Sequence, residues 1–266
     1  MKRFLWITDI HLNFVDQTGA AHFFAELAAV PADGILLSGD IAEAPDVGLY
    51  LALFDKVLGR PTYFVLGNHD FYRGTIAGVR QKVVALCAAC PDLHWLPQSG
   101  VVALTENTGL VGHDGWGDGR LGHYWGLAVH LNDWRLIGEF IGLDPARRLE
   151  TLHALGDEAA AHFATVLPEA LERFRHIVVV THVPPFREAC WYDGRISDDN
   201  WLPHFTCKAV GDVLARMMAA HPEHQMTVLC GHTHGAGEAQ VLPNLRVLTG
   251  GALYRKPALQ RVLEIV

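Results

Sequence analysis

Residues that can bind metal ions occur in five short segments of the chain. The segments are Asp9-Ile10-His11, Gly39-Asp40, Gly67-Asn68-His69-Asp70, Thr181-His182 and Gly231-His232-Thr233-His234. Their donors are imidazole nitrogens and carboxylate or amide oxygens, without cysteine thiolates, which is a ligand set that manganese, iron, zinc and cobalt ions accept. The residue types therefore predict a site for divalent metal ions, with manganese favoured.

The number of candidate ligands exceeds the need of a single ion. The candidates are Asp9, His11, Asp40, Asn68, His182, His232 and His234. A carboxylate can bridge two cations, and two ions roughly 3.5–4 Å apart form the clamp used in phosphoester hydrolysis. We therefore predict two divalent ions, with Asp40 as the bridging ligand.

Each candidate also has a purely structural interpretation. His182 follows a valine run and could be a histidine at the edge of the core. Asn68 follows a glycine and could be a turn residue, whereas Asp9 and Asp40 could be helix N-caps. These interpretations would have to hold independently in all five segments, so a converging site is the simpler interpretation.

The five segments need backbone elements that bring them together. Each segment follows an apolar run typical of a buried β-strand, at residues 4–7, 35–37, 63–66, 177–180 and 227–230. Helical patterns lie between these runs, at residues 20–30, 47–58, 76–89 and 208–221. Repeated strand-helix units predict an α/β fold with a largely parallel sheet, in which the carboxyl-terminal strand ends meet at one edge.

Glycine precedes a candidate ligand in three of the segments, at Gly39, Gly67 and Gly231. Glycine suits tight turns and allows the backbone to pass close to a bound ion or phosphate. We expect these three glycines to form the turns that hold the ligands.

Together the five motifs resemble those of the calcineurin-like metallophosphoesterase superfamily, and they stand in the family's order over residues 9–234. The resemblance implies a four-layer α/β-β-α sandwich. It assigns Asp9, His11 and His234 to one ion and Asn68, His182 and His232 to the other, with Asp40 between the two ions. It further implies that His69 protonates the leaving alkoxide or contacts the phosphoryl oxygen, and that Asp70 orients His69.

The resemblance implies hydrolysis of a phosphoester of a small molecule by a metal-bound hydroxide. The ligand set leaves open whether the substrate is a phosphodiester or a phosphomonoester. As an alternative, the chain could be a metal-binding scaffold or interaction protein of the same fold with little catalysis. Because the chain keeps every candidate ligand, we favour the enzyme.

Composition limits the organisation of the chain. With 266 residues, of which 50% are hydrophobic, the chain can form one domain over residues 1–266. A formal charge of −8 and the absence of a lysine- or arginine-rich run argue against nonspecific nucleic-acid binding. The five cysteines form no convincing zinc or redox motif, and no stretch is apolar enough to predict a membrane span. Together with an amino terminus that enters a predicted strand directly, these features favour a cytoplasmic protein.

Two segments are expected to lie around the cleft. The first is a cap insertion around residues 113–175, which begins in a glycine-rich loop at 112–120 and ends in a helical pattern at 145–171. The second is a rim loop around residues 186–205. Loops at the carboxyl ends of strands commonly set substrate choice.

Four residues of these segments are candidates for substrate contact. Arg120 and Arg195 could bind a phosphate or a leaving group, although surface arginine is the alternative. Trp116 and Trp191 could stack on a ring of the substrate, and we slightly prefer packing within the cap. Short β signals at residues 94–96, 101–104, 110–112 and 245–249 would form the second sheet that the resemblance implies.

Overall fold

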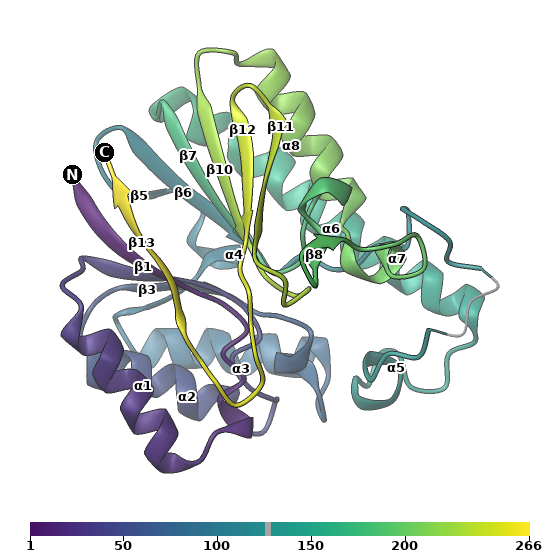
Figure 1. The fold of residues 1–266 in the computed structure, drawn as a ribbon, viewed down its shortest axis with the longest axis horizontal. Helices are drawn as coiled ribbons and strands as arrows, with labels where there is room; N and C mark the ends of the chain where they lie inside the picture. The colour runs from purple at the N-terminus through teal and green to yellow at the C-terminus, as the bar shows by residue number, and fades with distance from the viewer. Residues whose placement is uncertain (126–128) are drawn as a thin grey trace.

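Two β-sheets form the centre of the computed structural model, which describes residues 1–125 and 129–266 (Figure 1). The first sheet has the strand order β13-β1-β2-β3-β4, and the second has the order β11-β12-β10-β7-β6-β5. A separate hairpin pairs β8 with β9. The strands are β1 (Lys2–Ile7), β2 (Gly34–Ser38), β3 (Thr62–Val65), β4 (Leu93–Trp95), β5 (Val102–Ala103), β6 (Thr108–His113), β7 (His176–Thr181), β8 (Trp191–Tyr192), β9 (Arg195–Ile196), β10 (Gln225–Cys230), β11 (Gly237–Leu242), β12 (Leu245–Thr249) and β13 (Leu259–Ile265).

Helices cover the outer face of each sheet. The regular helices are α1 (Gln17–Ala29), α2 (Val47–Leu53), α3 (Ile76–Ala89), α4 (Leu96–Ser99), α5 (Asp133–Leu136), α6 (Pro145–Arg173), α7 (Leu202–Phe205) and α8 (Lys208–Ala220). Short helical turns complete the chain at Leu12–Phe14, Phe54–Leu58, His69–Phe71 and Arg187–Ala189, of which Phe54–Leu58 is a π-helical continuation of α2. The predicted helices at 76–89 and 208–221 therefore agree with α3 and α8 to within one residue.

Three hydrophobic clusters separate four layers. One lies between the first sheet and α1, α2 and α3, one lies between the two sheets, and one lies between the second sheet and α6 and α8. Alternation along β1 shows how one strand serves two clusters, because Leu5 faces the helices whereas Phe4 and Trp6 face the other sheet. The predicted α/β-β-α sandwich is confirmed.

The strands that carry the candidate ligands do not share one sheet. β1, β2 and β3 pair in parallel in the first sheet, whereas β7 and β10 pair in parallel in the second. Strand periodicity predicts a strand and its buried faces but not its partner, so a single sheet was the simplest expectation from the sequence. Packing of the two sheets face to face brings both sets of carboxyl-terminal ends to one edge.

Two further expectations were wrong in placement. The β signal at 94–96 forms β4, which pairs with β3 in the first sheet and not in the second. The glycine-rich segment at 112–120, which was expected to be a loop at the rim of the cleft, is buried over most of its length. Its first residues continue β6, which pairs with β7 in the middle of the second sheet.

The long helix α6 was expected to cap the cleft, but most of it belongs to the outer helical layer. Its buried residues Ala159, Phe163 and Leu167 pack in the cluster beneath the second sheet, beside α8. Only its first turns approach the first cluster, through Leu152. The single domain with an insertion at 113–175 stays a prediction, and residues 126–128 of that insertion lie outside the described residues.

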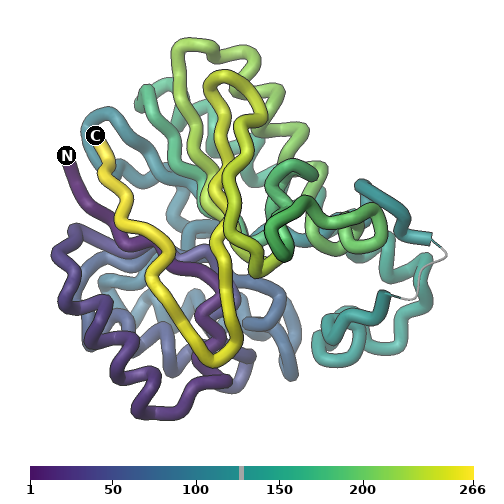
Figure 2. The backbone as a smooth tube through the Cα atoms, in the orientation of Figure 1, coloured from purple at the N-terminus to yellow at the C-terminus, as the bar shows by residue number. Residues whose placement is uncertain are grey.

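The two ends of the chain run side by side (Figure 2). β13 pairs antiparallel with β1, so Lys2 lies opposite Ile265. The segment between β12 and β13 crosses from the second sheet to the first and passes the ligand-bearing edge. Among the described residues, no helix combines the length and apolar character needed to cross a membrane.

Candidate metal centre

The backbone of the ligand-bearing loops takes an unusual conformation. Among the described residues, positive φ angles occur at eight residues other than glycine, and five of them are candidate ligands. These five are Asp9, His11, Asp40, His232 and His234, with φ between 41° and 70°. Such angles cost about 1–3 kcal/mol each and persist at sites where the surroundings enforce them. The helix N-cap interpretation is also excluded for Asp9 and Asp40, because α1 and α2 begin after Asp16 and Asp46.

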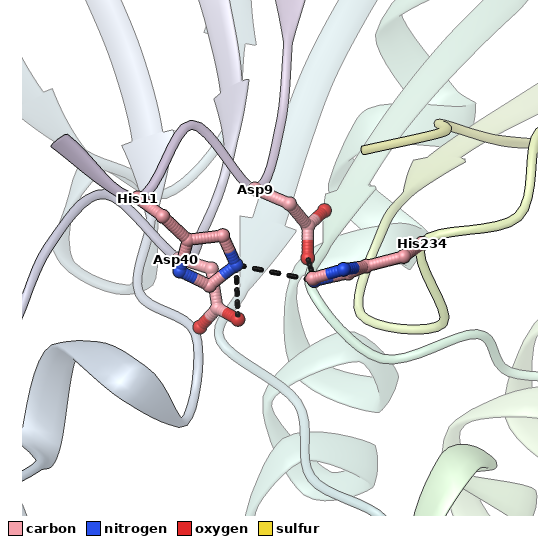
Figure 3. A group of neighbouring side chains, drawn as sticks. All are labelled: Asp9, His11, Asp40 and His234. Carbon is pink, nitrogen blue, oxygen red and sulfur yellow. Dashed lines mark hydrogen bonds and ion pairs between the residues drawn. The ribbon is translucent and has the colours of Figure 1, made fainter. Parts of the chain in front are cut away.

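Four of the candidates form one compact group (Figure 3). One ligand atom from each of Asp9, His11, Asp40 and His234 lies within 4.8 Å of the others. His11 Nε2 is 3.6 Å from an Asp40 carboxylate oxygen, and His234 Nε2 is 3.4 Å from one of Asp9. The two imidazole Nε2 atoms are 3.1 Å apart. We call Asp9, His11 and His234 the first half of the site.

The other three candidates gather on the opposite side of Asp40. Asn68 Oδ1 is 3.0 Å from His232 Nδ1 and 3.3 Å from His182 Nε2. The two imidazole nitrogens are themselves 3.2 Å apart. Asn68, His182 and His232 form the second half of the site.

Asp40 stands between the two halves. Its Oδ2 faces His11, whereas its Oδ1 lies 3.4 Å from His182 Nε2 and accepts a hydrogen bond from the His69 amide at 2.9 Å. Each oxygen is thus directed at a different group of ligands. This arrangement fits the predicted bridging role.

Hydrogen bonds determine which imidazole nitrogens are free in the second half. His182 Nδ1 lies 2.8 Å from the Ser38 carbonyl, and His232 Nε2 lies 3.1 Å from the His204 carbonyl. Because a carbonyl only accepts, both of these nitrogens must carry the proton. The other nitrogen of each ring, which faces Asn68, is then left as a lone-pair donor in the neutral form, and this is the usual arrangement in metal sites.

The buried charges of the site fit cations as well. The carboxylates of Asp9 and Asp40 are both buried, although ionised carboxylates are costly to bury unless a positive charge compensates them. A set of carboxylate, imidazole and amide donors around two centres meets that need and fits two borderline divalent ions.

Without a metal, protons take part of this role. Burial opposes the charged form of His182, but the carboxylates of Asp40 and Asp9 outweigh it and raise the pKa of His182 to about 10. The same histidine, against the opposing effect of burial, helps to hold the pKa of Asp40 well below its usual value. Burial lowers the pKa of His232 to about 3, with a further contribution from His182, and lowers that of His11 to about 4.

His69 lies beside the first half of the site. Its ring centroid is 4.6 Å from that of His11 and 4.2 Å from that of Tyr72. The His69 ring is partly exposed, and its Nδ1 is buried without a partner. The position beside the candidate ligands is compatible with the proposed role toward a leaving group.

Asp70 has different partners from the expected ones. Its Oδ1 accepts hydrogen bonds from the Ile41 and Ala42 amides, both at 2.9 Å, and its Oδ2 accepts one from Gly67 at 2.8 Å. No hydrogen bond joins Asp70 to the His69 ring. Asp70 therefore ties the loop after β2 to the loop after β3, and burial together with the nearby Asp40 raises its pKa to about 8.

Two glycines are required by close contacts within the site. A Cβ atom at Gly231 would lie 1.9 Å from an Asp9 carboxylate oxygen, and one at Gly67 would lie 2.1 Å from Asp40 Oδ1. The expectation that these turns pass close to the site agrees with the structure. The backbone approaches the ligand side chains themselves.

Asp133 and Tyr72 belong to the site but lie outside the five sequence motifs. Asp133 is only 3% exposed, and its Oδ1 accepts hydrogen bonds from Asn68 Nδ2 at 2.9 Å and from the Tyr72 hydroxyl at 2.7 Å. Tyr72 follows the motif Gly67-Asn68-His69-Asp70 by two residues, so its position in the sequence could have made it a candidate. Asp133 lies 65 positions from Asn68 in a segment without a recognisable motif.

Asp114 supports the second half of the site through the loops that carry two of its ligands. Its Oδ1 accepts hydrogen bonds from the Leu66 amide at 2.8 Å and from Trp95 Nε1 at 3.0 Å. Its carbonyl accepts the His182 amide at 2.9 Å, and its Oδ2 pairs with Arg80 at 3.3 Å. One residue of the glycine-rich segment therefore holds the loops that carry Asn68 and His182.

The residues expected at the rim have mostly structural contacts. Arg120 pairs with Asp118 and Asp157, and Trp116 is 5% exposed and packs against Phe71 and Phe140. These two residues therefore pack and pair within the fold, in line with the alternatives weighed for them.

The rim loop contributes a pocket beside the second half of the site. The pocket has a volume of about 320 Å³ and is lined in part by Tyr192, Arg195, Trp201 and Phe205. The Phe205 ring centroid is 5.1 Å from that of His232. Trp191, in contrast, packs against Gly237. On the other side, Tyr254 is 48% exposed and lies 4.7 Å from the His11 ring and 5.1 Å from the His234 ring.

Comparison with known proteins agrees with this geometry. The chain matches the calcineurin-like phosphoesterase family over residues 2–236. The phosphopantetheinyl hydrolase of Mycobacterium tuberculosis has a similar structure, with 16% identity and a TM-score of 0.67 over 95% of this chain and 90% of that one. A dimetal phosphatase from Danio rerio is similar with 13% identity and a TM-score of 0.59 over 96% and 88%. No curated protein matches the sequence. Because the family match spans most of the chain, this protein belongs to the calcineurin-like metallophosphoesterase superfamily.

Proposed function

We propose that the protein is a hydrolase that cleaves a phosphoester with two divalent metal ions. One observation carries this proposal: the seven candidate ligands converge on two adjoining groups, with one oxygen of Asp40 facing each. When bound, the two cations would supply a hydroxide nucleophile and offset the charge of the phosphate. The first half would hold one ion through Asp9, His11 and His234, and the second half would hold the other through Asn68, His182 and His232.

The residues around the ions have separate tasks in this proposal. The Ser38 and His204 carbonyls accept hydrogen bonds from His182 Nδ1–H and His232 Nε2–H, which leaves His182 Nε2 and His232 Nδ1 with lone pairs toward the cation. His69, beside the first half, donates a proton to the leaving alkoxide as general acid. Asp70 keeps the loops of Asp40 and Asn68 in register through its three backbone hydrogen bonds.

We further propose a preference for phosphodiesters. The site has an aromatic wall on each side, namely Tyr254 beside the first half and the Phe205 pocket beside the second. A diester carries two organic groups and can contact both walls, whereas a monoester can contact only one. The donor set accepts manganese, iron, zinc and cobalt, and manganese is the ion that we propose to test first.

The test compares two chromogenic substrates with the same leaving group. Metal-stripped protein is resupplied with manganese, and hydrolysis of bis-nitrophenyl phosphate is measured beside that of nitrophenyl phosphate. Faster turnover of the diester that depends on added metal would support the proposal. Equal metal-dependent turnover of both substrates would refute the diester preference alone.

An enzyme with a narrow substrate requirement would hydrolyse neither nitrophenyl ester, so the substrate panel must include further phosphoesters. The phosphopantetheinyl hydrolase with a similar fold makes a phosphopantetheinyl ester a reasonable member of the substrate panel. If no member of the panel is hydrolysed while two ions are bound, the scaffold alternative replaces the enzyme.

A further inference from the structure

We propose that Asp133 is a positioning residue that sets the affinity of the second half of the site for its metal ion. The inference rests on the proposed function, because it takes Asn68 as a ligand of one of the two proposed ions. Asp133 begins α5, in the segment between β6 and α6, and its carboxylate is buried. A buried carboxylate far from the motifs needs partners that compensate its burial, and Asn68 and Tyr72 provide them.

Asp133 fixes the orientation of the Asn68 side-chain amide. An amide group has one oxygen acceptor and one NH₂ donor, so fixing either end fixes the other. Asp133 accepts a hydrogen bond from Asn68 Nδ2 at 2.9 Å, while Asn68 Oδ1 faces His182 and His232. Rotation of the amide by half a turn would place two acceptors together at Asp133 and would turn the NH₂ group toward the cation site. Asp133 thus selects the orientation that can bind a metal.

Tyr72 contacts both Asp133 and Asn68. Its hydroxyl donates to the same Asp133 oxygen at 2.7 Å and lies 3.3 Å from Asn68 Nδ2. Its ring stands 4.2 Å from the His69 ring, measured between centroids. Asp133 therefore supports the Asn68 side chain directly and the surroundings of His69 through Tyr72.

The α5 segment is attached to the fold by contacts that do not involve Asp133. The α5 segment is also held by backbone hydrogen bonds from Arg73 to Leu136 at 2.7 Å and from Gly138 to Gly74 at 2.9 Å. Glu139 accepts the amide of Ile76 at the start of α3, at 2.9 Å. The segment therefore has anchors that do not involve Asp133, and a change at Asp133 can be compared with a change at an anchor.

The experiment measures metal binding in three variants of the full chain. Asp133→Leu removes the acceptor at similar size, Asp133→Asn keeps a carbonyl oxygen that can accept both hydrogen bonds, and Glu139→Ala weakens an anchor away from the site. Manganese titration of the metal-stripped proteins gives the number of ions bound and the affinity of each. Loss of a residue that supports a ligand commonly weakens metal binding by roughly tenfold to a hundredfold.

We expect Asp133→Leu to bind one of the two ions roughly tenfold to a hundredfold more weakly. The variant should regain hydrolysis at a high manganese concentration. Asp133→Asn and Glu139→Ala should bind both ions nearly as the parent protein does. The proposal is overturned if Asp133→Leu binds both ions with unchanged affinity, or if Glu139→Ala weakens binding to the same degree. Failure of the proposed function would appear separately, as two ions bound by the parent protein without hydrolysis of any substrate.

Discussion

The two halves of the metal centre differ in how they are supported. In the first half, His11 and His234 contact Asp40 and Asp9, and Asp9 also accepts a hydrogen bond from the hydroxyl of its sequence neighbour Thr8 at 2.6 Å. In the second half, Asn68, His182 and His232 each have an outer hydrogen bond, to Asp133, to the Ser38 carbonyl and to the His204 carbonyl. Two of these three partners come from the segments between β6 and α6 and between β7 and α8.

This difference shows where variation can alter the site without changing a ligand. Outer hydrogen bonds orient ligands and tune their basicity. A change in α5 or α7 can therefore alter the second half, whereas the contacts of the first half come from the motif residues and from Thr8, which directly precedes Asp9. The predictions below test this contrast.

The largest effect is expected from Asp40→Ala, which should weaken metal binding in both halves of the site. Asp40→Ala takes away the residue that faces both halves, so both ions should bind weakly and hydrolysis should fall by more than about a hundredfold, the upper range for residues that only support a ligand. Metal content and turnover are measured together. Glu172→Ala, at an exposed carboxylate in the last turns of α6, serves as the control and should change neither. Two ions retained with normal affinity in Asp40→Ala would contradict the bridging role.

His69→Ala should separate proton transfer from metal binding. Loss of a general acid costs roughly 10²- to 10⁴-fold in turnover, and the loss should be greatest for alkyl leaving groups that need a proton. Nitrophenolate leaves without protonation, so its release should suffer less. Turnover of an alkyl and a nitrophenyl diester is compared, with His22→Ala as a control at an exposed histidine. An equal loss for both leaving groups, with metals retained, would count against the acid role.

Asp114→Ala tests the supports of the second half by stability. The change leaves the Leu66 amide and Trp95 Nε1 without their acceptor and removes one of the two carboxylate partners of Arg80. Breaking a buried ion pair in this way should lower the free energy of unfolding by about 3 kcal/mol. Urea unfolding measures the loss, with Asp157→Ala as a control at an exposed ion pair on α6. A loss as small as that of the control would show that Asp114 is replaceable.

The smallest effect is a pH dependence of metal binding. Asp40 and Asp9 raise the pKa of His182 to about 10 against the effect of burial, so His182 is protonated at neutral pH in the metal-free protein. A metal needs the neutral imidazole, so binding must release this proton. Affinity in the second half should therefore rise with pH, by about tenfold per unit below that pKa. Calorimetry in buffers of different ionisation enthalpy counts the released protons, and binding without proton release would contradict the assignment.

Much of the molecule could be predicted from local pattern. The apolar runs predicted the ligand-bearing strands, and helical periodicity placed α3 and α8 to within one residue. Local signals sufficed because side-chain periodicity depends only on near neighbours along the chain. Other expectations depended on distant partners and went differently, as in the division of the ligand strands between two sheets and the hydrogen bonds of Asp70.

By itself, the sequence determined the chemistry of the site, because the types and order of the five motifs limit the donors to imidazole, carboxylate and amide groups. Only the tertiary structure decided how those donors are held. The contact between Asp133 and Asn68 spans 65 positions, and that between Asp114 and Leu66 spans 48. Neither pair has a periodicity that reveals it, since the contact exists only after two sheets and their connecting segments have packed together.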